Sequence, residues 1–134
     1  MTHVSQKKLD KKFDKLLSRV LVGVFTGNSG DSTSSILQSL LTKTEIQMFK
    51  KRIAIFMLRD AGFTLREISY LSKTTTQTAQ RQLLTTKTTS TQSRLLRKKL
   101  KKLYTKHNIV DFIKSADRSF APSSLRRKIS SYSK

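Results

Sequence analysis

Apolar residues recur at three- and four-residue steps through most of the chain, a pattern typical of amphipathic helices. The first such stripe lies within residues 5–25 and consists of Leu9, Phe13, Leu16, Leu17, Val20, Leu21 and Val24. It predicts one helix over residues 5–25, buried on most sides in its second half, where charged residues no longer occur. Turn-forming residues predict a loop over residues 26–32. A short helix through residues 36–41 should follow, capped by a Ser or Thr from residues 32–35.

Two Thr-x-x-Glu sequences, Thr42–Glu45 and Thr64–Glu67, mark the starts of the next two helices. In such a capping box the threonine accepts a hydrogen bond from the backbone three residues on, and the glutamate reaches back. Behind the first box lie apolar residues at helical spacing, namely Ile46, Phe49, Ile53, Phe56 and Met57. Gly62 is placed to end that helix in a left-handed cap. We therefore expect a long helix up to Gly62, a tight turn, and a two-turn helix behind the second box.

Between Ser72 and Ser93 the composition changes to Thr, Ser and Gln. Such a run is typical of a flexible linker, because Thr is a mediocre helix former and polar runs bury little surface. We favour a helix for residues 75–84 and a linker for residues 85–93. A stripe of leucines among cations then predicts a basic amphipathic helix over residues 94–106.

The end of the chain has a weaker pattern. A sparse apolar stripe predicts a helix over residues 109–120, capped by Asn108 and closed by Pro122, and residues 123–134 are predicted to be a Ser-rich basic tail. Two interpretations of the whole extension stay open: a clamp that follows phosphates, or a dimerisation helix whose leucines pack on the N-terminal helix. Both can hold at once, because leucines and cations occupy different faces.

Charge narrows the choice of partner. The 134 residues include 28 Lys and Arg against 8 Asp and Glu, a formal net charge of +20. A polyanion, either nucleic acid or an anionic membrane surface, is therefore the first partner to consider. Residues 1–86 hold 14 basic and 6 acidic side chains, a net +8, whereas residues 87–134 hold 14 and 2, a net +12. The last third of the chain should therefore supply most of the electrostatic affinity.

Several classes of protein are excluded by what the sequence lacks. The absence of Cys rules out disulfide scaffolds, Cys-based zinc fingers and cysteine nucleophiles, and the two histidines, His3 and His107, lie too far apart to suggest a metal centre. No catalytic pairing is suggested by spacing, so we expect no enzyme and no cofactor. No window of about 18 apolar residues occurs, and charges interrupt any signal-peptide core. We expect a cytoplasmic protein without integral membrane association.

Residues 64–84 carry the most informative pattern. Residues 65–71, 72–74 and 75–84 would be the first helix, the turn and the second helix of a helix-turn-helix. The positions that such motifs bury fall on Ile68, Ser72, Thr74, Ala79 and Gln82, of which only Ile68 and Ala79 have the expected character. The second helix, however, is rich in side chains that bond base edges, and no acidic residue occurs between Glu67 and Asp111.

The candidate DNA contacts follow from this assignment. Residues proposed to read bases are Thr75, Thr76, Gln77, Thr78, Gln80 and Arg81. Residues proposed to contact phosphates are Thr64, Arg66, Lys73, Lys87, Arg94, Arg97, Lys98 and Lys101. Gln suits adenine, Arg suits guanine or phosphate, and Thr suits phosphate or the thymine methyl group.

Residues 41–68 resemble the Trp repressor superfamily, in its branch of small Trp-repressor-like proteins. The matching points are the Leu-Thr opening with an acid three residues on, Arg52 in mid-helix, the terminal Gly62, the Arg-Glu-Ile sequence that follows, and Thr78-Ala79-Gln80-Arg81. The resemblance covers residues 33–86, and the N-terminal helix by layout only. It implies an all-α helical bundle in which the N-terminal and C-terminal helices of two subunits interlock, with the helix-turn-helix projecting as a DNA-reading head. We expect a Trp-repressor-like domain over residues 1–92 and, without counterpart in that family, a basic helical extension over residues 93–134.

The resemblance also implies a possible effector pocket. Two arginines that flank the indole in the Trp repressor correspond to Arg52 and Arg81, and Thr42 would face the pocket from the partner subunit. Gln82 stands where the Trp repressor has glycine and would fill the space, so we expect DNA binding without a tryptophan-like effector.

Taken together, the residues predict a homodimeric, sequence-specific regulator of transcription that places residues 75–84 in the major groove of double-stranded DNA. The alternative is a protein that binds nucleic acid non-specifically, as nucleoid proteins or RNA-binding proteins do, or an anionic membrane surface. In that alternative the basic helix of residues 94–106 would be the active element.

Overall fold

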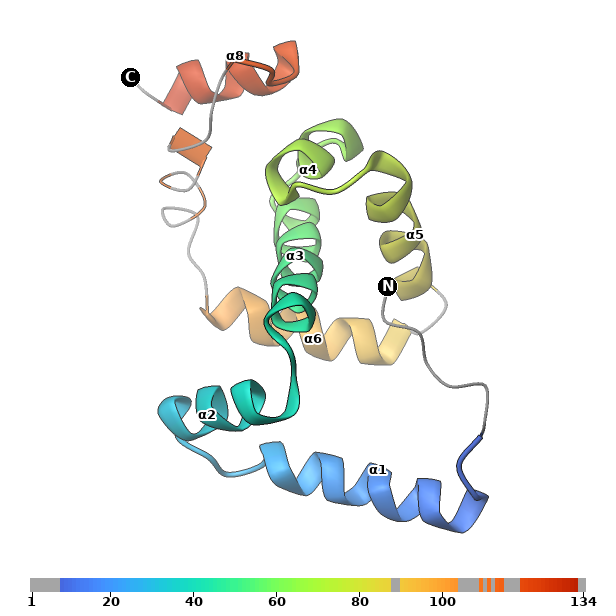
Figure 1. Cartoon of the computed structure of the whole chain (residues 1–134). Helices are drawn as coiled ribbons and strands as arrows, with labels where there is room; N and C mark the ends of the chain where they lie inside the picture. Colours follow the sequence, from blue (N-terminus) through green and yellow to red (C-terminus); the bar gives the residue numbers. More distant parts are fainter. Residues whose placement is uncertain are drawn as a thin grey trace. The chain divides into compact units, whose positions relative to one another are not determined.

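The computed structural model describes residues 8–87, 90–103, 109, 111, 113, 114 and 119–132. All regular elements among these residues are α-helices (Figure 1), which confirms the prediction of an all-α fold. The elements are α1 (Lys11–Phe25), α2 (Gly30–Leu40), α3 (Lys43–Asp60), α4 (Leu65–Ser72), α5 (Thr76–Lys87), α6 (Ser90–Leu103) and α8 (Ser123–Tyr132). No helix in the described part of the chain is at once long enough and apolar enough to cross a membrane.

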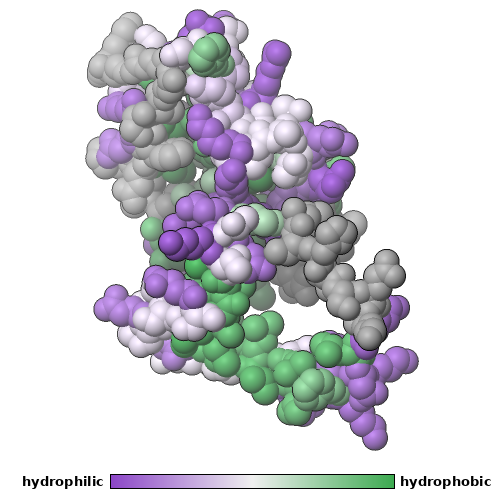
Figure 2. Space-filling view, in the orientation of Figure 1, coloured by the Kyte–Doolittle hydropathy of each residue, from purple (hydrophilic) through white to green (hydrophobic). Residues whose placement is uncertain are grey.

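The chain divides into two compact units, residues 1–46 and residues 47–134. The first unit contains α1 and α2. The expected burial of the second half of α1 is wrong within a single chain, because Leu21 and Val22 are 57% and 67% exposed and no residue of this helix is buried. Figure 2 shows the resulting apolar surface along α1, at the bottom of the view.

The loop after α1 is shorter than expected. α2 begins at Gly30 rather than after residue 32, because Ser29 is its N-cap and accepts a hydrogen bond from the Ser32 backbone N–H at 3.3 Å. Asp31 in the first turn adds a negative charge where the helix dipole favours one. The cap expected among residues 32–35 is therefore corrected to Ser29.

Both predicted capping boxes are confirmed. Glu45 accepts from the Thr42 backbone at 2.8 Å, and Glu67 accepts from the Thr64 backbone at 2.9 Å. Gly62 ends α3 with a φ of 88°, and the Phe63 N–H bonds back to the Leu58 carbonyl at 3.1 Å. This left-handed cap reverses the chain within a few residues and places Phe63 in the core.

One hydrophobic core in the second unit joins α3, α4, α5 and α8. Its buried members are Ile55, Leu58, Phe63, Ile68, Leu71, Ala79, Ile109, Ile113, Ala121, Leu125 and Ile129. Five of them come from beyond residue 104, so the C-terminal region completes the core around α4. The helix expected over residues 109–120 lies partly outside the described residues, and within it Ser119 and Phe120 form a turn.

Two expectations about the second half of the chain are wrong. Residues 85–87 and 90–93 are helical rather than a linker, residues 88 and 89 lying outside the described ones. Residues 123–132 form α8 rather than a tail, because Leu125 and Ile129 lie four residues apart on one helical face and are both fully buried. The Pro122 carbonyl accepts from the Arg126 N–H at 3.0 Å, so Pro122 opens α8.

Candidate nucleic-acid interface

α4 and α5 pack against each other across a turn of three residues, Lys73 to Thr75. Ile68 from α4 and Ala79 from α5 are both 0% exposed and fix the contact between the two helices. The order and spacing of these elements agree with the two helices and turn expected from the sequence. This arrangement leaves the opposite side of α5 open to solvent.

Ser72 is a polar residue at a position where helix-turn-helix motifs usually have an apolar one. It is buried, and its hydroxyl donates to the Ile68 carbonyl at 2.7 Å. It also lies 2.8 Å from the hydroxyl of Thr74, the next polar residue at such a position. A buried hydroxyl that has its hydrogen bonds carries little penalty, so the turn tolerates these two side chains.

The six residues expected to read bases, Thr75, Thr76, Gln77, Thr78, Gln80 and Arg81, are all exposed. They surround the buried Ala79 and cover the first turns of α5. Thr75 also caps this helix, since its hydroxyl accepts from the Thr78 N–H at 3.1 Å and lies 2.8 Å from the Thr78 hydroxyl. The start of α5 is thus capped while its polar side chains are exposed to solvent.

The turn between α4 and α5 carries two lysines. Lys73 ends α4 in the left-handed conformation, with a φ of 55°, and its ammonium lies 4.8 Å from the centre of the Tyr70 ring. Lys51 of α3 donates to the Lys73 carbonyl at 3.0 Å. Lys51 could not be identified from the sequence. It precedes Lys73 by 22 residues, and no pattern between the two residues indicates that α3 passes beside the turn.

Residues expected to contact phosphates occupy two further places. Thr64 and Arg66 at the start of α4 are exposed, as are Arg94, Lys98 and Lys101 on α6. Arg97 of α6 is different: its Nε lies 3.3 Å from Oδ1 of Asp60, so it joins α6 to the end of α3. Lys87 is the last residue of α5.

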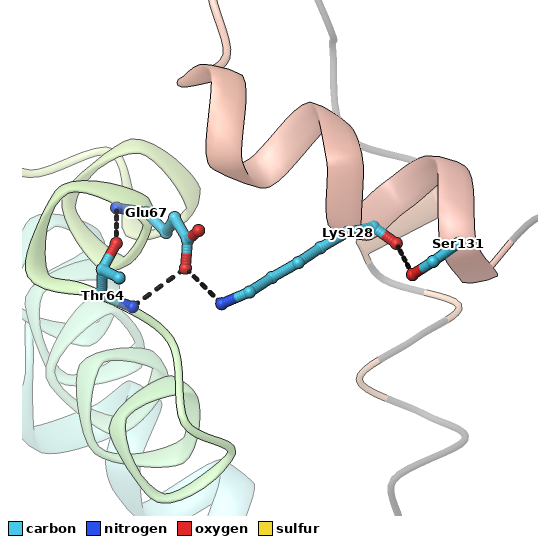
Figure 3. Close-up of polar contacts among 4 residues, drawn as sticks. All are labelled: Thr64, Glu67, Lys128 and Ser131. Atoms are coloured by element: carbon cyan, nitrogen blue, oxygen red, sulfur yellow. Dashed lines mark hydrogen bonds and ion pairs between the residues drawn. The ribbon is translucent and has the colours of Figure 1, made fainter.

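The start of α4 contains a buried charge. Glu67 is fully buried, and Lys128 of α8 donates to its Oε2 at 2.8 Å (Figure 3). Burial favours the neutral acid, but the hydrogen bonds from Lys128 and the Thr64 N–H, together with the positive charge of Lys128, outweigh it and hold the pKa of Glu67 below its ordinary value. From the sequence, Glu67 was predicted only to form a capping box, and Lys128 was predicted to lie in a tail.

Two residues of the implied effector pocket, Thr42 and Arg52, make local contacts. Thr42 is engaged in its capping box, and these hydrogen bonds hold the pKa of Glu45 below its ordinary value. The Arg52 guanidinium lies 5.9 Å from the centre of the Phe49 ring on the same helix, and Arg81 lies on the outer side of α5. The pocket stays a prediction. Among the described residues no group of three His, Asp or Glu side chains lies close enough to hold a metal ion.

The described residues thus form a basic, all-α protein. Its helix α5 packs against α4 and exposes polar side chains, none of which is acidic. Comparisons with models of protein families, with curated proteins and with solved structures found no match for this chain.

Proposed function

We propose that the chain is a cytoplasmic, sequence-specific DNA-binding regulator of transcription, in which α4 and α5 form a helix-turn-helix and α5 enters the major groove. The observation that carries this proposal is the outer side of α5. Its exposed residues are Thr, Gln and Arg on a helix anchored by the buried Ala79. Bidentate contacts from Gln to adenine and from Arg to guanine are the usual means of reading bases there.

The surroundings of α5 suit a phosphate backbone. No acidic residue occurs between Glu67 and Asp111, and Glu67 itself is buried and paired with Lys128. We propose that Lys51 joins Lys73 in contacting phosphates beside the turn. The exposed cations of α6 would add affinity that does not depend on sequence, and this part of the binding would weaken steeply with salt.

A dimer would give the protein the two-fold symmetry that many DNA-binding regulators share with their operators. The apolar side of α1 supports a homodimer, because a helix that buries none of its residues needs a partner to cover them. The leucines of α6 offer a second apolar surface, with Leu95 and Leu103 exposed. The resemblance of residues 33–86 to the Trp repressor superfamily is consistent with such a dimer of N-terminal and C-terminal helices.

The proposal is tested by selecting bound duplexes from a random pool with the full chain at about 150 mM salt, near the ionic strength that screens weak contacts. We expect enrichment of a palindromic sequence, which would demonstrate both base readout and a symmetric dimer. Failure to enrich any sequence would refute specific readout. Binding to random duplexes or to vesicles with anionic lipids would then favour the basic helix α6 as the active element.

A further inference from the structure

Lys128 of α8 joins two parts of the chain that precede it by about sixty residues. Its ammonium donates to Glu67 Oε2 at 2.8 Å (Figure 3) and lies 4.8 Å from the centre of the Phe63 ring. Phe63 lies in the turn between α3 and α4, and Glu67 lies in the first turn of α4. Lys128 therefore contacts both sides of the point where the chain enters α4.

The Glu67 carboxylate makes this contact important for the local structure. The same Oε2 that receives Lys128 also accepts the Thr64 N–H at 2.9 Å and so closes the capping box of α4. Glu67 is 0% exposed, and a buried carboxylate without a counter-charge is strongly unfavourable. Loss of Lys128 would therefore draw Glu67 toward solvent and open the first turn of α4.

α4 transmits this constraint to the helix that faces the DNA. Ile68, next to Glu67, is fully buried against the core that also holds Ala79 of α5 and Leu125 and Ile129 of α8. A shift of the first turn of α4 would therefore move the surface on which α5 rests. Closely packed cores respond to such a shift by rearranging rather than by absorbing it locally.

We propose that Lys128 is a positioning residue of the DNA-reading head, fixing α4, and through it α5, by its ion pair with Glu67. This inference depends on the proposed function for its effect on DNA, but the effect on α4 does not depend on it. Lys128 then acts on the protein rather than on phosphate, although it lies in the most basic third of the chain. Its neighbour Arg127 is exposed on the outer side of α8 and provides a matched control.

The first test follows hydrogen exchange of backbone amides in the full chain without DNA, for Lys128→Met, Arg127→Met and the double variant Glu67→Gln with Lys128→Met. We expect Lys128→Met to speed exchange in α4 and α5 by about 10-fold or more and to leave α1 unchanged. Arg127→Met should stay within about 2-fold of the unmodified chain. The double variant should recover most of the protection, because a neutral glutamine needs no counter-charge.

The second test uses a duplex obtained by selection and a scrambled duplex, at a temperature where circular dichroism shows each variant folded. We expect Lys128→Met to lower the ratio of the two affinities by about 10-fold, the effect of one misplaced base contact. Its salt dependence should change no more than that of Arg127→Met, which removes the same charge from the same helix. Lys128→Arg should restore the ratio, because it keeps a cation over Phe63 and beside Glu67.

Equal exchange rates in Lys128→Met and Arg127→Met would overturn the proposal whether or not the protein binds DNA. If exchange in α4 and α5 becomes faster but the affinity ratio is unchanged, only the proposed effect of α4 on base reading is overturned. If the unmodified chain prefers no duplex, the proposed function fails, while the exchange experiment still decides whether Lys128 fixes α4.

Discussion

Replacing Ile129 by Ala tests whether α8 is part of the core or an accessory on its surface. Ile129 is fully buried and belongs to the same cluster as Ile68 and Ala79. The change removes three carbon atoms. At about 0.8 kcal/mol per buried group, the free energy of unfolding should fall by about 2.4 kcal/mol. A cavity that the neighbours fill only in part raises the loss to about 3–4 kcal/mol, within the range measured for such truncations.

The assay is urea unfolding of the full chain, followed by circular dichroism at a single protein concentration so that any dimer contributes equally. For an m-value of about 1–3 kcal/mol/M, the midpoint should fall by about 1–4 M. The matched control is Ser130→Ala, because Ser130 follows on the same helix but is exposed. Its free energy of unfolding should change by no more than about 0.5 kcal/mol. If Ile129→Ala and Ser130→Ala unfold at the same urea concentration, α8 does not complete the core. The proposed support of α4 and α5 by α8 is then refuted.

Three further changes give expected outcomes. Lys73→Gly should stabilise the chain by about 0.5–1 kcal/mol in thermal unfolding, because glycine adopts the φ of 55° without the cost that a side chain carries; a loss of stability would contradict this. Thr64→Ala should destabilise it by about 0.5–2 kcal/mol, the usual effect of a lost N-cap, with Thr76→Ala as an exposed control. Because the pKa of Glu67 is lowered in the folded chain, its contribution is complete above about pH 4.3 and is lost as the pH falls through the folded value. Glu67→Gln should therefore show a shallower loss of stability in urea unfolding between about pH 5 and pH 3, and an equal slope would contradict the pairing.

Local signals in the sequence predicted the middle of the chain well. Both capping boxes and the left-handed cap at Gly62 are formed, because each depends on side chains and backbone within four residues of one another. Ile68 and Ala79 are buried as expected, and the candidate base-reading residues of α5 are exposed. What the sequence could not show is that Ser72 satisfies its own hydroxyl within α4 and so replaces an apolar residue.

Contacts between distant residues were not predictable in the same way. α8 has two buried apolar residues in ten, a pattern too sparse to distinguish from a polar tail, and it becomes a helix of the core only because α4 offers a surface for it. Lys128 was counted as one cation among many, although the buried carboxylate of Glu67 gives it a separate role. Likewise Lys51 and Arg97 acquire their contacts from the packing of α3 against the turn and α6.

Base reading by α5 is measured by comparing three variants on one selected duplex and its single-base substitutions. Arg81→Ala and Gln77→Ala should each lose about 1–3 kcal/mol of discrimination at one base position and keep it elsewhere. Lys98→Ala should weaken binding to every duplex alike and reduce its salt dependence. Unchanged discrimination in both α5 variants, with binding lost only in Lys98→Ala, would contradict the claim that α5 reads DNA.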